Sequence, residues 1–266
     1  MSDAEQASLV ELRREDDGRI AVVTLNRPHS LNAISGDTAE EMTEVFRSVA
    51  HDENVWVMVL GAAGERAFSV GADLKERAAF GLNDFFRNRE QVRNMFSGLR
   101  KVPQPTIASV FGFALGGGFE LALSCDIIIA AQGTELGLPE VRVGLVPGGG
   151  GTQLLARRVG LGRAKEMIFR GRRIDASEAQ QLGIVSYVAS PHELAGYTME
   201  VARDLCRSSP VALREAKAAI DATVGVTLEE GIALEDDAWR RVISTEDSAE
   251  GIAAFNEKRE PLWQNK

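Results

Sequence analysis

The chain has few of the side chains on which small stapled folds and metal sites depend. It contains two cysteines, three histidines and two tyrosines in 266 residues. Cys125 and Cys206 are far apart, and we expect both to be reduced thiols rather than a structural disulfide. The histidines lack metal-ligand spacing, so no metal is expected. The nucleophile elbow of many hydrolases, G-x-S-x-G, is also missing.

Long apolar runs and an excess of basic residues are missing as well. No run approaches the roughly 18 apolar residues that a membrane-spanning helix needs. The N-terminal segment MSDAEQASLVELRREDD has no apolar core, so we expect no signal peptide. With 30 basic and 39 acidic residues, the net charge is −9. An acidic protein repels nucleic acid and anionic membranes. We therefore expect a cytoplasmic protein that binds neither.

Strand and helix patterns alternate over the first two thirds of the chain. Apolar and β-branched runs predict strands at residues 9–13, 19–25, 55–60, 68–70, 106–110, 127–131 and 185–188. Helices are predicted at residues 37–49, 84–100 and 115–123, and almost throughout from residue 152. The pattern predicts an α/β core over residues 1–190, followed by a helical region over residues 191–266.

Several helix starts carry local signals. Asp37 with Glu40 has the spacing of a capping box at the start of the first helix. Pro191 and Pro210 stand where a helix tolerates proline, in its first turn. Gly71 ends a short strand, and a helix is expected to begin near Ala72. Unpaired N–H groups at that start are suited to an anion or a polarised carbonyl oxygen, although a purely structural turn also requires the glycine.

Three consecutive glycines open the apolar helix GGGFELALSCD, and Glu120 is its one acidic member before Asp126. A glycine in a helix costs about 1 kcal/mol relative to alanine, so their retention suggests a close approach to the backbone. A buried carboxylate is costly unless it is paired, and such groups often have a chemical role. The alternative is that Glu120 faces solvent on an amphipathic helix.

A second glutamate, Glu140, follows Pro139 and precedes the glycine run Gly148–Gly151. Acids are favoured in first turns for electrostatic reasons alone, so Glu140 is also compatible with a cap. The glycine run lacks the Lys-Ser/Thr of a Walker A motif and the G-x-G-x-x-G spacing of dinucleotide sites. Nucleotide binding is therefore not expected.

A helical stretch before residue 100 is rich in aromatic and basic residues. Its phenylalanines are expected in the core or an interface, namely Phe80, Phe85, Phe86 and Phe96. Its arginines are expected in solvent, namely Arg87, Arg89, Arg93 and Arg100.

Together, PTIASVFGFALGGGFELALSCDIIIAA and LGLPEVRVGLVPGGGGTQLLARRVG resemble the crotonase (enoyl-CoA hydratase/isomerase) superfamily, and the similarity extends from about Leu9 to the C-terminus. GADLKER, GGGFELALSCDI and VPGGGGTQ are similar to the branch with 3-methylglutaconyl-CoA hydratases. The resemblance implies an α/β fold, a crotonase-like spiral of ββα units with a helical C-terminal trimerisation region. It also implies a homotrimer or a dimer of trimers.

The resemblance also implies an activity, hydration of a 2-enoyl-CoA thioester across C2=C3. The thioester oxygen would lie in an oxyanion hole formed by the N–H groups of Ala72 and Gly117. Glu120 would hold and activate water, and Glu140 would donate a proton to C2. Gly148 would help to place the water.

CoA is part of the substrate in this reaction, and no cofactor is implied. The resemblance suggests a CoA site that includes Arg27, Ala33, Asp73, Leu74, Lys75, Phe255 and Lys258. Cations among them would meet the CoA phosphates.

Three alternatives remain open. The first alternative is a 3-methylglutaconyl-CoA hydratase. The second is a Δ3,Δ2-enoyl-CoA isomerase, which needs a single base, and the third is a non-catalytic binding module. Some relatives in the methylglutaconyl branch bind RNA through a lysine-rich helix, but residues 36–54 here are acidic, so RNA binding is not expected. Phe119, Leu136 and Leu138 depart from the usual pattern and are expected to reshape the acyl pocket.

Overall fold

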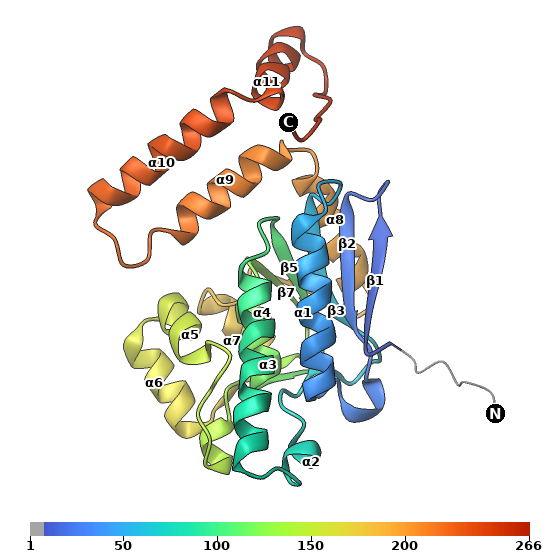
Figure 1. Cartoon of the computed structure of the whole chain (residues 1–266), viewed down its shortest axis with the longest axis vertical. Helices are drawn as coiled ribbons and strands as arrows, with labels where there is room; N and C mark the ends of the chain where they lie inside the picture. Colours follow the sequence, from blue (N-terminus) through green and yellow to red (C-terminus); the bar gives the residue numbers. More distant parts are fainter. Residues whose placement is uncertain (1–7) are drawn as a thin grey trace, which may run out of the picture.

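The computed structural model describes residues 8–266, in which two β-sheets are flanked by helices (Figure 1). The expectation about a signal peptide depends partly on residues 1–7, which lie outside the described part. Within residues 8–266, no helix is both long and apolar enough to span a bilayer.

The larger sheet has the strand order β1-β2-β3-β5-β7-β10. Its strands are β1 (Val10–Glu15), β2 (Ile20–Leu25), β3 (Val57–Ala62), β5 (Thr106–Val110), β7 (Ile127–Ala131) and β10 (Tyr187–Ala189). The first two strands form an antiparallel hairpin, and every other neighbouring pair is parallel. The continuous apolar run of β2 is buried on both faces, as the sequence predicted, because helices cover both sides of the sheet.

The smaller sheet has the order β4-β6-β8-β9. Its strands are β4 (Ala67–Ser69), β6 (Phe113–Leu115), β8 (Glu135–Gly137) and β9 (Arg173–Asp175). Three residues are too few to show alternation, so the last three were not predicted. The successive pairs β3/β4, β5/β6 and β7/β8 each send one strand to each sheet before a helix follows. The predicted α/β spiral of ββα units is therefore confirmed.

Helices fill the space around the sheets and the whole C-terminal end. They are α1 (Gly36–His51), α2 (Leu74–Arg77), α3 (Leu82–Arg100), α4 (Gly117–Leu123), α5 (Gly151–Val159), α6 (Leu161–Arg170), α7 (Ala176–Gln181), α8 (Leu194–Leu205), α9 (Pro210–Asp221), α10 (Leu228–Ile243) and α11 (Glu246–Glu257). Two short 3-10 helices are η1 (Pro28–Ser30) and η2 (Glu140–Val143).

Two helix starts differ from the prediction. The N-cap of α1 is Ser35, whose Oγ accepts a hydrogen bond from the Thr38 N–H at 3.2 Å, so the capping box on Asp37 was wrong. An acid inside the first turn is equally favourable, which explains why Asp37 resembled a cap. Pro191 precedes α8 by three residues, whereas Pro210 is the first residue of α9, as predicted.

The helix predicted at 115–123 begins at Gly117, because Gly116 has a backbone conformation (φ +54°, ψ −128°) that only glycine adopts readily. The helix expected near Ala72 begins at Leu74, after Asp73 caps it with its side chain. The strand predicted at 185–188 lies two residues later, in β10.

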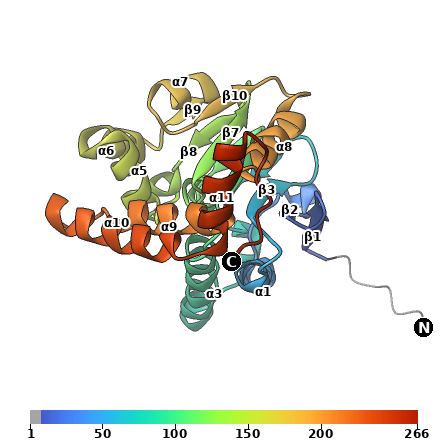
Figure 2. The same ribbon diagram turned by 90° about the horizontal axis from the view of Figure 1, so that it is seen from above.

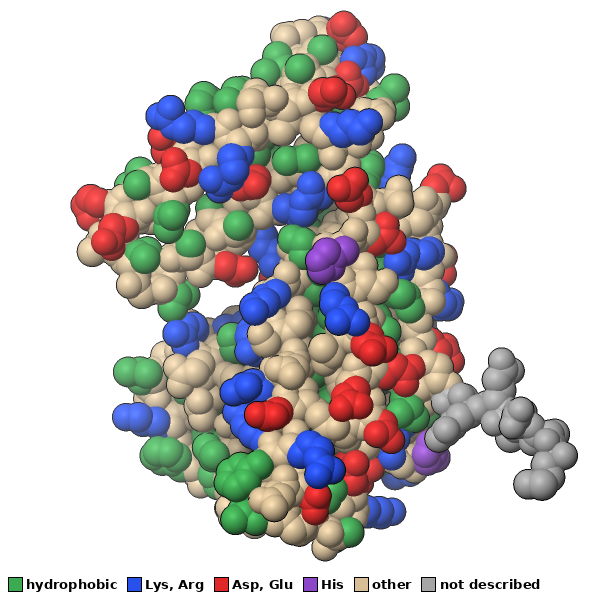
Figure 3. All heavy atoms as spheres, in the orientation of Figure 1, with side chains coloured by type: hydrophobic (Ala, Val, Ile, Leu, Met, Phe, Trp, Pro, Cys, Tyr) green, Lys and Arg blue, Asp and Glu red, His purple; other side chains and the backbone are tan. Residues whose placement is uncertain are grey.

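The core has two parts, one on each face of the larger sheet. The sheet face toward α1, α3 and α4 carries the larger cluster, which includes Phe46, Phe96 and Phe119. On the opposite face α8 packs through Leu194 and Ala202. Beyond α8, helices α9, α10 and α11 form an arm that stands away from the sheets (Figures 1 and 3). In the arm α9 and α10 run side by side (Figure 2). The division predicted near residue 190 stays a prediction.

Candidate active site

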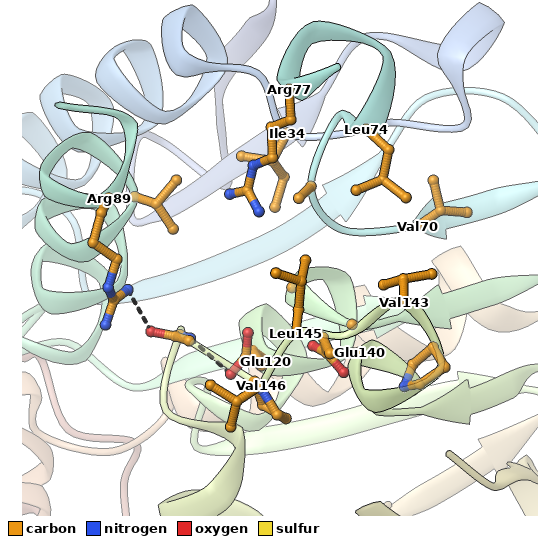
Figure 4. Close-up of a pocket in the computed structure, with 18 of the residues that line it drawn as sticks. Ile34, Val70, Leu74, Arg77, Arg89, Glu120, Glu140, Val143, Leu145 and Val146 are labelled. Atoms are coloured by element: carbon orange, nitrogen blue, oxygen red, sulfur yellow. Dashed lines mark hydrogen bonds between the residues drawn. The ribbon is translucent and has the colours of Figure 1, made fainter. Parts of the chain in front are cut away.

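A cavity of about 620 Å³ lies between α2 and α3 on one side and α4, η2 and the glycine run on the other (Figure 4). Its walls are mostly apolar. The apolar members include Ile34, Val70, Leu74, Phe85, Val92, Phe96, Val143, Leu145 and Val146. The polar members include Arg77, Asn88, Arg89, Glu120, Glu140, Arg142 and Arg173. A largely apolar pocket with a few convergent polar groups is the usual form of a small-molecule site.

Two backbone donors, the N–H groups of Ala72 and Gly117, lie side by side at this cavity. Neither donates a hydrogen bond within residues 8–266. A Cβ atom built on Gly117 would lie 3.8 Å from Ala72 N, and one built on Gly71 would lie 2.6 Å from Gly117 N. Glycine is required at Gly71 for this approach and for its φ of +83°. The pair therefore places two free donors close together at the cavity.

The third glycine, Gly118, serves packing against β4. A Cβ atom there would lie 2.1 Å from the carbonyl oxygen of Ser69. The close approach predicted from the three glycines is thus partly an approach of the protein's own backbone. It brings the start of α4 against β4 and so places Gly117 next to Ala72.

Glu120 is buried, with 3% of its surface exposed, so the solvent-facing alternative is wrong. Its Oε1 atom accepts hydrogen bonds from the N–H groups of Gly149 and Gly151, each at 2.7 Å. Burial raises the pKa of Glu120, and the N–H groups of the glycine run oppose that shift. With Oε1 occupied, Oε2 is the oxygen available to a small molecule in the cavity.

Glu140 lies on η2, beside Glu120 on the same wall of the cavity (Figure 4). Its side chain makes no cap, and Oε2 is buried without a hydrogen-bond partner in the described chain. Burial, with a smaller contribution from the charge of Glu120, raises the pKa of Glu140 to about 7. Glu140 therefore carries a proton for a large share of the time near neutral pH. Such a carboxyl suits proton donation.

The predicted CoA residues fall into two groups. Arg27 contacts Asp73 (Nη2–Oδ2, 3.1 Å) and donates to the Ala33 carbonyl, so these three lie together. Leu74 lines the cavity, and the Lys75 side chain is exposed next to it.

The remaining two CoA residues lie elsewhere. Phe255, in α11, and Lys258, just after it, are on the arm, at the opposite end of the molecule from α2 (Figure 1). The single chain does not bring them to the cavity.

One sequence-based expectation about side chains near the site was wrong, and another was incomplete. Phe119, Leu136 and Leu138 are buried in the core, and none of them lines the cavity. Arg89 and Arg100 are exposed, as expected, but they also donate hydrogen bonds to the carbonyls of the glycine run. The sequence signal for this role was their spacing, because side chains eleven residues apart lie on the same face of a helix.

Gly148 lines the cavity, and its N–H has no acceptor within the described residues. The amides that bind Glu120 belong instead to Gly149 and Gly151, which the sequence did not single out. No group of three or more metal-binding side chains gathers within residues 8–266.

The family model described as enoyl-CoA hydratase/isomerase matches residues 15–266. The short-chain-enoyl-CoA hydratase of Clostridium acetobutylicum is 40% identical over 245 residues, 92% of this chain and 94% of that protein. The mitochondrial methylglutaconyl-CoA hydratase of Mus musculus is 37% identical over 254 residues, 94% of this chain and 81% of that protein. The chain belongs to the enoyl-CoA hydratase/isomerase family. This confirms the resemblance seen in the sequence.

A solved structure supports the same assignment. The enoyl-CoA hydratase from Bacillus anthracis has a TM-score of 0.95 and 39% identity, covering 97% of this chain and all of that chain (100%). For a member of the enoyl-CoA hydratase/isomerase family, the paired free amides and the two adjacent carboxyls are the groups able to polarise a carbonyl and move protons.

The raised pKa of Glu140 predicts how stability depends on pH. The carboxyl titrates at about 7 in the folded protein against an ordinary value of 4.5, so folding favours its protonated form. As pH rises from 4.5 through 7, wild type should therefore lose stability relative to Glu140→Gln. At pH 8 the variant should be more stable by about 1–2 kcal/mol, less than the full shift would give because the carboxyl is partly hydrated.

Urea unfolding at pH 4.5 and pH 8 measures this difference. Below pH 4.5 the neutral carboxyl and the amide are close to isosteric, so the two proteins should converge. An equal stability difference at both pH values would contradict the assignment.

Proposed function

We propose that the protein is an enoyl-CoA hydratase, which adds water across the C2=C3 bond of a 2-enoyl-CoA. One observation carries the proposal: Glu120 and Glu140 lie side by side at a cavity that also holds the free N–H groups of Ala72 and Gly117. Relatives named enoyl-CoA hydratase, at 39–40% identity, support it.

The two amides account for activation of the substrate. The thioester oxygen would accept hydrogen bonds from Ala72 and Gly117, and these bonds strengthen as the oxygen gains enolate character. Losing one such donor typically costs about 3 kcal/mol of transition-state stabilisation. Because both donors are backbone groups held by tight glycine contacts, they need no reorganisation during the reaction.

The two carboxyls account for the proton transfers. Glu120, as a carboxylate, holds a water molecule and takes one of its protons while the oxygen bonds to C3. Glu140, protonated, delivers its proton to C2, so the product gains one hydroxyl and one hydrogen. The proton on Glu120 then passes to Glu140, directly or through solvent, which restores both groups. Microscopic reversibility exchanges the roles in dehydration.

No further cofactor is needed for this chemistry, because the thioester makes its own α-carbon acidic once the oxygen is held. The cluster of Arg27, Ala33 and Asp73, with the neighbouring Lys75, would meet the CoA moiety next to Leu74. Arg27 and Lys75 are the cations in this group. Phosphates favour such partners.

Glu120→Gln and Glu140→Gln should each lower the hydration rate of crotonyl-CoA by several orders of magnitude, because each removes one of two required proton transfers. The loss of the conjugated thioester absorbance measures the rate. Glu200→Gln, a change of an exposed side chain on α8 outside the cavity, is the matched control. Near-normal hydration in either active-site variant would contradict the two-carboxylate mechanism, and conversion of a 3-enoyl-CoA without hydration would favour an isomerase.

A second candidate, 3-methylglutaconyl-CoA hydratase, is favoured by a cation in the acyl pocket. The Arg77 side chain points into the cavity from the wall opposite the glutamates (Figure 4). Its Nε and Nη2 atoms donate to Asn88 Oδ1 at 3.2 and 3.0 Å, and no carboxylate lies within 4.0 Å of it in residues 8–266. A distal carboxylate on the acyl group would supply the missing partner. The methylglutaconyl-CoA hydratase of Mus musculus is among the relatives.

Arg77→Met should then lower kcat/KM for 3-methylglutaconyl-CoA at least about tenfold more than for crotonyl-CoA, since a hydrogen bond to a charged group contributes about 1.5–3 kcal/mol. Arg87→Met, on the exposed side of α3, should change neither value. Steady-state kinetics with both substrates decides the point. Equal losses for the two substrates would mean that Arg77 does not read a distal charge.

We further propose that the chain assembles as a homotrimer or a dimer of trimers through its arm. The facing sides of α9 and α10 leave large apolar side chains in solvent, including Ile220, Leu228, Ile232 and Trp239 at 55–73% exposure. Extended apolar surfaces of this kind mark association sites. In such an assembly, Phe255 and Lys258 would contact CoA bound to a neighbouring copy and not CoA bound to their own chain.

Light scattering should give a mass about three or six times the 28.8 kDa chain. Trp239→Glu should shift it toward the single chain, because a buried unpaired charge is costly. Glu229→Gln, at the exposed start of α10, is the control. A single-chain mass for wild type would contradict the proposal.

A further inference from the structure

The glycine run that binds Glu120 is itself held from the other side by α3. Arg89 Nη1 donates to the Gly148 carbonyl at 2.6 Å, and Arg100 Nη1 donates to the Gly149 carbonyl at 2.8 Å. Between them the Phe96 ring packs so closely that a Cβ atom on Gly149 would lie 2.3 Å from it.

These three contacts come from one stripe of the helix. Residues 89, 96 and 100 are separated by seven and four positions, which places them within about 40° around a helix of 3.6 residues per turn. The stripe therefore faces the glycine run along about three turns and holds the carbonyls of Gly148 and Gly149. Arg93 lies on the same face of α3, four residues after Arg89, but it is exposed and makes no such bond in the described chain.

One peptide group connects Arg89 with Glu120 through two hydrogen bonds. The carbonyl of Gly148 and the N–H of Gly149 belong to one rigid plane, in which they point in opposite directions. Arg89 holds the carbonyl, and Glu120 Oε1 accepts from the N–H at 2.7 Å. A cation on the carbonyl polarises the peptide and strengthens its N–H as a donor.

We propose that Arg89 and Arg100 are positioning residues, which act through the Gly148–Gly151 backbone to orient Glu120 and keep it in its carboxylate form. The proposal rests on the hydratase function and assigns no contact between these arginines and the reacting atoms. The charged groups around Glu120 include Arg77 from α2, Arg89 and Arg100 from α3, and Glu140 from η2. Of these, only the arginines favour the carboxylate.

Three substitutions of matched length test the proposal. Arg89→Met and Arg100→Met should each lower kcat about ten- to a hundredfold for crotonyl-CoA with little change in KM, since a small displacement of a catalytic group costs up to about 100-fold. The acid limb of the kcat/KM profile should move to higher pH by about half a unit or more, because a less stabilised Glu120 protonates earlier. Arg93→Met should match wild type.

Arg89→Lys and Arg100→Lys guard against simple misfolding. Each keeps the positive charge, so the acid limb should return toward the wild-type pH while kcat stays reduced. A uniform loss of activity with an unmoved pH profile in the methionine variants would overturn the proposal.

Hydrogen exchange by mass spectrometry supplies a readout that does not depend on activity. Amides in residues 146–152 should exchange faster in Arg89→Met and Arg100→Met than in wild type, and unchanged in Arg93→Met. Equal exchange in all four proteins would overturn the proposal even if hydration is observed. The methionine variants could exchange faster while the wild-type protein hydrates no enoyl-CoA. That result would support the arginine contacts and refute the hydratase function.

Discussion

The site depends on one buried carboxylate held by backbone amides. Glu120 is almost without solvent, and an ionised group in that position is tolerated only because two N–H groups of the glycine run converge on Oε1. The requirement explains the local sequence. Gly150 has φ +124°, and a Cβ atom on Gly151 would lie 2.9 Å from Glu120 Oε1, so the run has room for little else.

The spiral topology brings the parts of this arrangement together from distant segments. Each ββα unit adds one strand to the smaller sheet, and the chain turns into the cavity just after β4, β6 and β8. These three exits supply Ala72, Gly117 and Glu140, respectively. The same repetition explains why short strands of three residues suffice, since each is stabilised by a parallel neighbour in the sheet.

Residues recognisable from sequence were those whose type is unusual in its surroundings. Glu120 in an apolar helix and glycines in a row are conspicuous without any structure, and the structure places them at one cavity with Ala72 and Glu140. Arg77, Arg89 and Arg100 were missed because an arginine in a helix is normally solvated. Their partners come from tertiary packing: Asn88 on α3 for Arg77, and the glycine run for Arg89 and Arg100.

The predictions of a helix boundary and of the residues that line the cavity failed for related reasons. Ser35 and Asp37 are both good caps by type, and the backbone angles that choose between them are tertiary. Phe119 directly precedes Glu120, and Leu138 lies two residues before Glu140, yet both side chains enter the core. Proximity in sequence was a poor guide to what lines the cavity.

The central claim is that the two glutamates together add one water molecule across a double bond. Mass spectrometry of the product formed from crotonyl-CoA tests it most directly, in parallel reactions in H₂¹⁸O and in D₂O. We predict one ¹⁸O at C3 and one deuterium at C2 for wild type, with neither formed at an appreciable rate by Glu120→Gln or Glu140→Gln. Label at C2 without oxygen at C3 in the wild-type product would contradict the account.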